Sequence, residues 1–230
     1  MADALFSSIE RFQGERPWGR LLDAGTGEHS LQWCRGLSAT EVVAVTGSPA
    51  RSQELSCVLG NWTDEALLHG ERFDTVLADY LLGAVDGFAP HFQSRLFGRL
   101  RRHVGDRLYV VGMEPMEDVD NLATRIARLR DACILLAGHR CYREYPRAWV
   151  LRNLESGGYR VLDSWSIPIV YRERWVQRQL DLGLSKLPWF ADQGLAVAMR
   201  NEIERVRTEC LAQLPITFGA DYVVVAEPRA

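Results

Sequence analysis

The sequence lacks a strong excess of either charge, and it is almost without lysine. It contains 27 basic and 30 acidic side chains in 230 residues, which gives a formal net charge of −3. Lys186 is the only lysine, and we attach no function to that bias. Proteins that bind polyanions in general carry a concentrated basic surface. The balance therefore argues against a general nucleic-acid binder, although a small and specific RNA contact stays open.

Long apolar runs and a disulfide pattern are lacking as well. No stretch of 18 apolar residues occurs, so we expect no membrane span. Residues 1–13 carry Asp3 and Glu10 and lack the basic start and apolar core of a signal peptide. The 5 cysteines are irregularly spaced, which indicates reduced thiols and a cytoplasmic location. The spacing of Cys133, His139 and Cys141 fits no standard zinc site, so we expect no metal.

The remaining composition is that of an ordinary globular protein, with 47% hydrophobic and 25% charged residues. Short β-rich runs alternate with amphipathic helical patterns, and this alternation predicts an α/β fold with a mostly parallel sheet. The expected strands, in chain order, are residues 20–23, 41–45, 56–61, 73–79, 107–112, 159–171 and 221–226.

Two helical stretches interrupt this alternation. One covers residues 118–156, after the fifth expected strand, and the other covers residues 172–219, after the sixth. Long insertions of this kind are candidates for a cap over a ligand site. We therefore predict a single domain over residues 1–230, in which the two insertions form a substrate cap.

A glycine turn follows the first expected strand, in the run Asp23-Ala24-Gly25-Thr26-Gly27. Glycines let a ligand approach the backbone, and the N–H groups of the next helix favour an anionic group. A nicotinamide site needs a third glycine three residues later and an acid about 20 positions on. Ser30 and Thr46 stand at those two positions, so the nicotinamide interpretation is the weaker one.

The run Leu-Asp-Ala-Gly-Thr-Gly closely resembles the first motif of class I S-adenosylmethionine-dependent methyltransferases. Further segments resemble later motifs of that family and occur in the family's order, at residues 44–47, 60–64, 73–80, 108–112 and 219–226. The resemblance covers residues 18–226. It implies a Rossmann-like, seven-stranded, mostly parallel sheet whose last strand is antiparallel.

The resemblance also implies a cofactor, S-adenosylmethionine, with S-adenosylhomocysteine as its product. Asp23 would order the glycine turn and the ammonium of the cofactor, Thr46 would meet the ribose, and Asn61 with Trp62 would meet the adenine. The complete set of implied cofactor residues is Asp23, Ala24, Gly25, Thr26, Gly27, Thr46, Gly47, Asn61, Trp62, Asp79 and Tyr80. Two departures stand out: Thr46 replaces the usual ribose-binding acid, and His29 occupies the third position of the glycine motif.

Methyl transfer from a sulfonium depends mainly on positioning, and it needs a general base only if the acceptor must lose a proton. The candidates for that base are His29, Asp79, Tyr80 and Glu114, which we do not rank. Tyr80 is followed by Leu81 and Leu82, where methyltransferases that act on amino groups of nucleic acids carry two prolines. Base methylation is therefore disfavoured.

The leading hypothesis is methyl transfer to a small-molecule acceptor under the helical cap, without a nucleic-acid or membrane partner. A homodimer stays open. Two alternatives also remain, namely a non-catalytic scaffold that binds S-adenosylmethionine and a methyltransferase that acts on protein or RNA.

Overall fold

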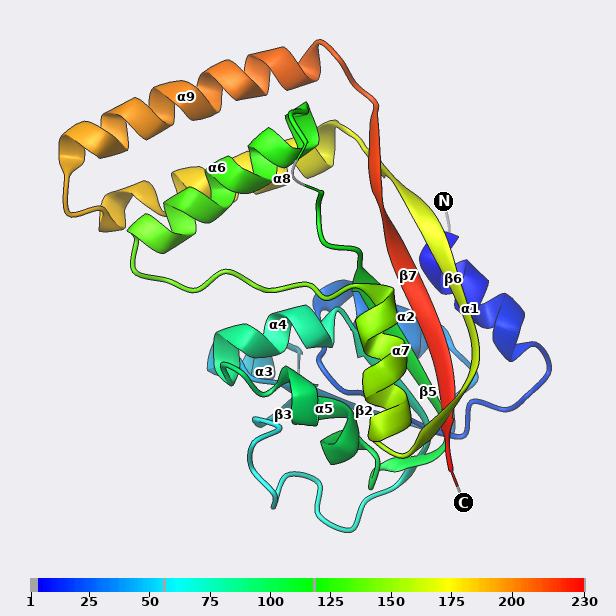
Figure 1. Ribbon diagram of the computed structural model, residues 1–230. Coiled ribbons are helices and arrows are strands. Elements are labelled where there is room, and N and C mark those ends of the chain that lie inside the picture. Colours follow the sequence, from blue (N-terminus) through cyan, green and yellow to red (C-terminus); the bar gives the residue numbers. More distant parts are fainter. Residues whose placement is uncertain (1–3, 56, 118, 230) are drawn as a thin grey trace. The chain divides into compact units, whose positions relative to one another are not determined.

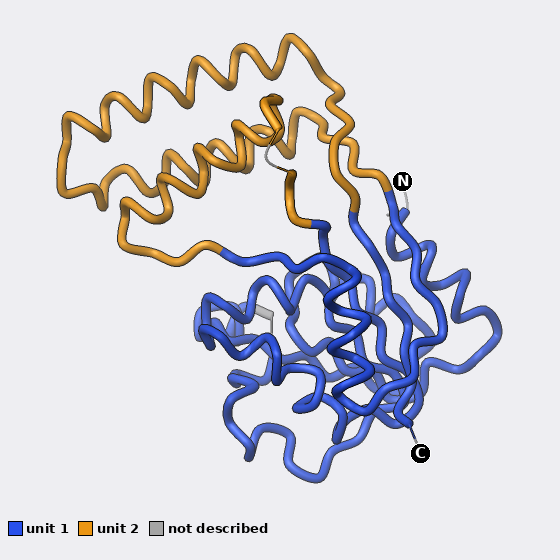
Figure 2. The backbone as a smooth tube through the Cα atoms, in the orientation of Figure 1, with its two compact units in different colours: residues 1–114, 142–167, 221–230 blue, residues 115–141, 168–220 orange. Residues whose placement is uncertain are grey.

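The computed structural model describes residues 4–55, 57–117 and 119–229, and it divides the chain into two compact units (Figure 2). Unit 1 consists of residues 1–114, 142–167 and 221–230, and unit 2 of residues 115–141 and 168–220. The sequence analysis expects one domain with two insertions. Ser56 and Asp118, which bound an expected strand and an expected insertion, lie outside the described residues, as do residues 1–3 and 230.

The sheet has seven strands in the order β3-β2-β1-β4-β5-β7-β6 (Figure 1). Four pairs, β1 with β2, β1 with β4, β2 with β3 and β4 with β5, are parallel, whereas β7 is antiparallel to β5. This arrangement confirms the predicted fold class. The strands are β1 (Arg20–Asp23), β2 (Glu41–Thr46), β3 (Val58–Leu59), β4 (Phe73–Asp79), β5 (Val104–Met113), β6 (Tyr159–Tyr171) and β7 (Ile216–Pro228).

The strand order reverses beside β1, because β2 lies on one side of it and β4 on the other. In open α/β sheets, ligands bind outside the carboxyl ends of the strands at such a switch point. The carboxyl ends of β1, β2 and β4 are Asp23, Thr46 and Asp79. Because β7 runs the other way and pairs Asp221 with Met113, its early part reaches the same edge.

Helices of unit 1 cover both faces of the sheet. They are α1 (Ala4–Gln13), α2 (Glu28–Gly36), α3 (Pro49–Leu55), α4 (Leu81–Phe88), α5 (Gln93–Leu100) and α7 (Arg147–Ser156). Successive residues of a strand point to opposite faces, and the burial follows this rule. Leu22, Val76 and Val110 enter the core beneath α4, α5 and α7, while Leu21, Leu77 and Val111 enter the core beneath α1 and α2.

The position of α7 differs from the expectation that residues 118–156 form one insertion. Val150 and Leu154, one turn apart on α7, are fully buried in the same core as Leu96 and Leu100 of α5. Figure 1 shows α7 and α1 on opposite sides of the strands β5, β7 and β6. The apolar face of α7 is therefore satisfied by the sheet, and the helix belongs to unit 1.

Unit 2 has an apolar core of its own. It is built from α6 (Leu122–Leu136), α8 (Glu173–Leu184), the short helix η1 (Leu187–Trp189) and α9 (Gln193–Leu211). Ile126, Val176 and Ile203, one from each long helix, are fully buried in this core. A three-helix core of this kind supports folding of the unit as a separate body. None of the described helices is long and apolar enough to cross a membrane.

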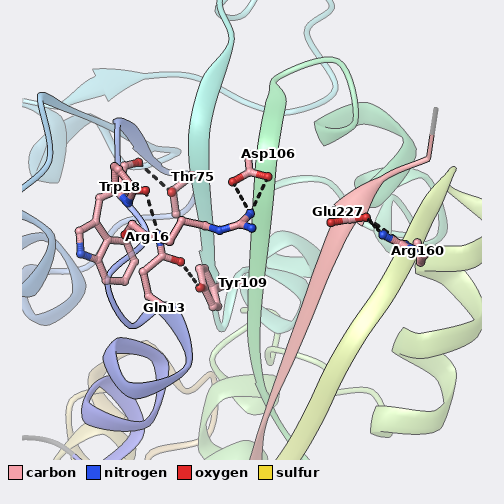
Figure 3. A network of polar contacts seen from close by, with 9 residues as sticks. Gln13, Arg16, Trp18, Thr75, Asp106, Tyr109, Arg160 and Glu227 are labelled. Atoms are coloured by element: carbon pink, nitrogen blue, oxygen red, sulfur yellow. Dashed lines mark hydrogen bonds and ion pairs between the residues drawn. The ribbon is translucent and has the colours of Figure 1, made fainter.

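A polar network fastens α1 and the segment after it to β4 and β5 (Figure 3). The Thr75 hydroxyl donates to the Trp18 carbonyl at 2.8 Å, and the Tyr109 hydroxyl donates to Oε1 of Gln13. Arg16 forms an ion pair with Asp106 at 2.9 Å. Thr75 and Asp106 lie early in their strands and Tyr109 lies near the middle of β5, so these contacts fix α1 without occupying the carboxyl edge.

Candidate functional site

The glycine turn at the end of β1 is held from three directions. The Ala24 N–H donates to the Leu77 carbonyl of β4 at 2.8 Å, and the Thr26 N–H donates to the Val45 carbonyl of β2 at 2.8 Å. The indole Nε1 of Trp62 donates to the Ala24 carbonyl at 2.6 Å. Backbone groups that would otherwise be unpaired are satisfied by both neighbouring strands and by a buried side chain. The turn is thus ordered by the protein itself.

A serine links the turn to the buried acid at the end of β1. The Gly27 N–H donates to Oγ of Ser30 at 3.1 Å, and the Ser30 hydroxyl donates to Oδ2 of Asp23 at 2.8 Å. Ser30 is not among the predicted cofactor residues. A serine three residues after a helix N-cap is the available signal, because this position can reach back to the cap N–H.

Asp23 is a carboxyl group with no exposed surface. Burial raises its pKa from 3.8 to about 6, although hydrogen bonds from Thr26, Ser30 and the Gly25 N–H act against the shift. Its second oxygen, Oδ1, has no hydrogen-bond partner at ordinary distance and angle among the described residues. A buried carboxylate oxygen without a donor is costly. Asp23 therefore fits a site that receives a donor or a cation from a ligand.

The three glycines of the predicted site have different surroundings. A Cβ atom on Gly27 would meet nothing within 4 Å, so this position faces open space. A Cβ atom on Gly25 would lie 2.5 Å from Cδ1 of Leu81, and one on Gly47 would lie 2.7 Å from Cδ1 of Phe88. Helix α4 thus places its first and last residues against the turns that follow β1 and β2. Leu81 and Phe88 are not among the predicted site residues, although their seven-residue spacing puts them on one helix face.

Thr46 and Asn61 come to the same edge of the sheet, as predicted. Oγ1 of Thr46 accepts from the Ser48 N–H at 3.2 Å, and the Thr46 carbonyl accepts from the Gly60 N–H at 3.0 Å. Nδ2 of Asn61 donates to the Phe88 carbonyl at 2.8 Å. The ends of β2, β3 and α4 are therefore joined to one another.

Trp62 does not fit the predicted contact with adenine. Only 3% of it is exposed, and the Arg99 guanidinium carbon lies 5.5 Å from its ring centroid. A buried tryptophan usually finds a partner for its N–H, and here the partner is the Ala24 carbonyl. The structure therefore favours a positioning role, in which Trp62 orders the glycine turn through its hydrogen bond to the Ala24 carbonyl.

Asp79 and Tyr80 end β4 at the same edge. Tyr80 has a left-handed backbone with φ of 46°, and its N–H donates to the Val111 carbonyl of β5 at 3.0 Å. Burial, and then the charge and hydrogen bond of Asp221, raise the pKa of the Tyr80 hydroxyl far above its usual value. The phenol thus keeps its proton and donates to Asp221, which argues against Tyr80 as the general base.

The other base candidates are not gathered into one cluster. The Glu114 carboxylate accepts from the Arg147 N–H at 3.3 Å, and it thus caps the start of α7. His29 is exposed at the start of α2, with its ring centroid 5.2 Å from that of Phe6 in α1. These placements give both residues a structural contact, while their predicted catalytic role stays a prediction.

The edge around Tyr80 is acidic. The charges of Asp221, Asp79 and Glu144 all raise the pKa of the Tyr80 hydroxyl, and those of Glu144 and Glu114 raise the pKa of the Tyr222 hydroxyl. Together with the buried Asp23, these carboxylates favour a positively charged ligand group at the carboxyl ends of β1, β4 and β5. Within the described residues, no group of three or more His, Cys, Asp or Glu side chains is arranged to hold a metal ion. The absence of a metal stays a prediction.

No family model and no curated protein matches this chain. Solved structures do match it over almost its whole length. A candidate methyltransferase from Bacillus halodurans C-125 is 13% identical, with a TM-score of 0.62 and coverage of 99% of this chain and 100% of that chain. Mycolic acid cyclopropane synthase CmaA1, solved with SAH and CTAB, is 18% identical, with a TM-score of 0.58 and coverage of 97% and 84%. The cyclase SpnF is 15% identical, with a TM-score of 0.54 and coverage of 98% and 80%.

At these identities the similarity establishes the fold. The chain has the fold of class I S-adenosylmethionine-dependent methyltransferases, which confirms the resemblance found in its sequence motifs. Fold alone does not assign a reaction, because one fold hosts several chemistries.

Proposed function

We propose that this protein is an S-adenosylmethionine-dependent methyltransferase. One observation carries the proposal: the buried Asp23 lies at the end of β1 beside a glycine turn that is open at Gly27. Its Oδ1 has no hydrogen-bond partner at ordinary distance and angle among the described residues. An ammonium group would supply the missing donor, and the amino-acid end of S-adenosylmethionine carries one. The complex of CmaA1 with SAH supports the same cofactor class.

The residues at the edge divide between the two ends of such a cofactor. Asp23 and residues 24–27 would hold its amino-acid part, with Trp62 and Ser30 ordering them. Thr46, Gly47 and Asn61 would hold the nucleoside, since they lie at the ends of β2 and β3. Thr46 offers a hydroxyl where the resembled family carries an acid, so the neighbouring turn must supply part of the ribose contact.

When bound, the cofactor supplies a methyl group on a sulfonium, which is an activated leaving group. The chain's own task is to hold the acceptor in line with that methyl group, and such positioning can lower a barrier by several kcal/mol. The carboxylates of Asp79, Asp221 and Glu144 favour the positive charge at this edge. Tyr80 keeps its proton and acts as a donor. Asp79, Glu114 and His29 remain the candidates for a base.

We further propose a small-molecule acceptor that is selected by unit 2. The chain enters unit 2 at Pro115, directly after β5 ends, and both β6 and β7 continue into it. Residues that follow the carboxyl ends of parallel strands commonly supply ligand contacts. The substrate cap formed by residues 118–156 and 172–219 stays a prediction, now restricted to the parts of those segments that belong to unit 2.

The first test is calorimetric titration of the purified protein with S-adenosylmethionine and with S-adenosylhomocysteine. We expect micromolar or tighter binding, about −8 kcal/mol, and a loss of at least about tenfold in Asp23→Asn. Asp163→Asn, at an exposed strand position, is the matched control and should bind as the wild type does. A folded wild-type protein that binds neither ligand would contradict the proposal.

A non-catalytic role is the second candidate, and Thr46 is the observation that favours it. A hydroxyl in place of the ribose-binding acid can leave a fold that holds the cofactor weakly or does not turn it over. SpnF, which has the same fold, is named a [4+2]-cyclase and not a methyltransferase. Transfer of labelled methyl groups to fractions of a metabolite extract distinguishes the two: transfer supports the enzyme, and tight binding without any transfer supports the scaffold.

A further inference from the structure

Phe88 is an exposed aromatic residue at the end of an otherwise buried helix face. Its exposed fraction is 45%, whereas Leu81, Leu82 and Val85 of the same helix are buried. Exposure of a single apolar side chain is common and needs no explanation by itself. The position of Phe88 matters because of the two segments that it contacts.

The first contact is with the turn that follows β2. A Cβ atom on Gly47 would lie 2.7 Å from Cδ1 of Phe88 and 3.0 Å from its Cγ, so the ring lies directly over the glycine backbone. No larger residue fits at position 47 while the ring is there. The ring of Phe88 therefore covers Gly47, which is one of the predicted cofactor residues and directly follows Thr46.

The second contact is with the loop that follows β3. Nδ2 of Asn61 donates to the Phe88 carbonyl at 2.8 Å, while Oδ1 of Asn61 accepts from the Thr63 N–H at 3.1 Å. Asn61 is thus oriented by Phe88 on one side and by its own turn on the other. The residue predicted to meet adenine and the exposed ring are fixed to each other.

Helix α4 also contacts residues 142–143, which belong to unit 1 as well. The Tyr142 ring lies against Gly87, where a Cβ atom would be 3.0 Å from Cε1, and the Arg143 N–H donates to the Gly83 carbonyl at 3.3 Å. The two glycines, one turn apart, let this segment approach the helix closely. Phe88 is therefore presented by a helix held between the 142–143 segment and the turn after β2.

We propose that Phe88 is a nucleoside-binding residue whose ring packs against the adenine of the bound cofactor. This inference rests on the proposed function. The ring offers an apolar face at the ends of β2 and β3, where Trp62 is buried and unable to provide one. By alanine substitution, stacking of a base on an aromatic ring contributes roughly 5- to 150-fold to the binding affinity. The Phe88 ring thus offsets part of the cofactor affinity that is lost because Thr46 stands in place of a ribose-binding acid.

The test compares two ligands and two sites by calorimetry. S-adenosylhomocysteine contains both the nucleoside and the amino-acid part, whereas 5′-methylthioadenosine lacks the amino-acid part. Phe88→Ala should weaken the binding of both ligands by about tenfold, and Phe88→Tyr should restore it. Asp23→Asn should weaken the binding of S-adenosylhomocysteine only. Trp189→Ala removes an aromatic residue of unit 2 that is 67% exposed, and it should change neither affinity.

Thermal unfolding of each variant without ligand separates lost contact from lost folding, and Phe88→Leu keeps the apolar volume if Phe88→Ala proves unstable. Unchanged affinity for both ligands in folded Phe88→Ala and Phe88→Leu would overturn the inference while leaving the proposed function intact. Tighter binding in Phe88→Ala would also overturn it, because the ring would then be an obstruction. If the wild-type protein binds neither ligand, the proposed function and this inference both fail.

Discussion

The indole Nε1 of Trp62 donates a 2.6 Å hydrogen bond to the carbonyl of Ala24, which lies 38 residues earlier in the chain. This contact joins the loop after β3 to the glycine turn after β1. Because both groups are buried, water cannot replace either hydrogen-bond partner. The order of the candidate site thus depends on a residue that the ligand need not touch.

Replacing Trp62 with phenylalanine should weaken both folding and cofactor binding. Phe keeps most of the ring packing but leaves the Ala24 carbonyl buried and unpaired, at a cost of about 1–3 kcal/mol. Trp33→Phe is the control, because Trp33 makes the same kind of bond, at 2.8 Å to Glu10, in an exposed setting. Denaturant unfolding should show a clearly smaller loss for that variant. Equal losses in the two variants would contradict the positioning role of Trp62.

Asp23 should lower the stability of the ligand-free protein at neutral pH, although it contributes to cofactor binding. Its pKa is raised by burial from 3.8 to about 6 in the folded protein, so protonation favours the folded state. The contribution of Asp23 to the free energy of unfolding is therefore fully present below about pH 4, and it is lost as the pH rises through about 6. Asp23→Asn should remove that loss and gain up to about 3 kcal/mol over the wild type between pH 4 and pH 8.

Denaturant unfolding across this pH range, without ligand, measures the effect. The gain should be accompanied by weaker cofactor binding in the same variant. A wild-type stability that does not decline relative to Asp23→Asn between pH 4 and pH 6 would show that the Asp23 pKa is not raised.

Gly27→Ala should separate binding from folding. Gly27 has φ of −113°, which alanine adopts freely, and a Cβ atom there would meet nothing within 4 Å. Its unfolding midpoint should therefore match that of the wild type, whereas a methyl group at the ligand-facing turn should reduce affinity for S-adenosylhomocysteine. Gly36→Ala, where the added Cβ atom also meets nothing within 4 Å, lies in helix α2, which favours alanine over glycine. This control should leave the affinity for S-adenosylhomocysteine unchanged. Undiminished affinity in Gly27→Ala would place the ligand elsewhere.

Tyr80 should not contribute to the alkaline titration of the native protein. Burial, followed by Asp221, raises the pKa of its hydroxyl, so the phenol stays protonated until the protein unfolds. The tyrosinate absorbance of Tyr80→Phe should follow that of the wild type up to the unfolding pH. If the native Tyr80→Phe variant shows one ionising tyrosine fewer than the native wild type, Tyr80 would again be a candidate for the base.

Much of the fold was predictable because its signals are local. The strands at residues 20–23, 73–79 and 159–171 have the expected bounds, since runs of β-favouring residues between turn signals mark strands in sequence. The glycine turn was also recognisable, because Gly25 and Gly27 directly follow a buried strand. These features depend on neighbours within a few residues.

The tertiary structure decided what those elements touch. The partner of Trp62 lies 38 residues away, and the ring of Phe88 lies over a glycine of another strand end. The apolar stripe of α7 is equally compatible with an insertion or with the sheet, and only packing assigned it to unit 1. A one-dimensional pattern shows which face of an element is apolar, and it leaves open which distant surface covers that face. Local patterns in the sequence therefore specify the strands, the glycine turn and the fold class, whereas long-range packing places the side chains that order the candidate site and those that stay exposed beside it.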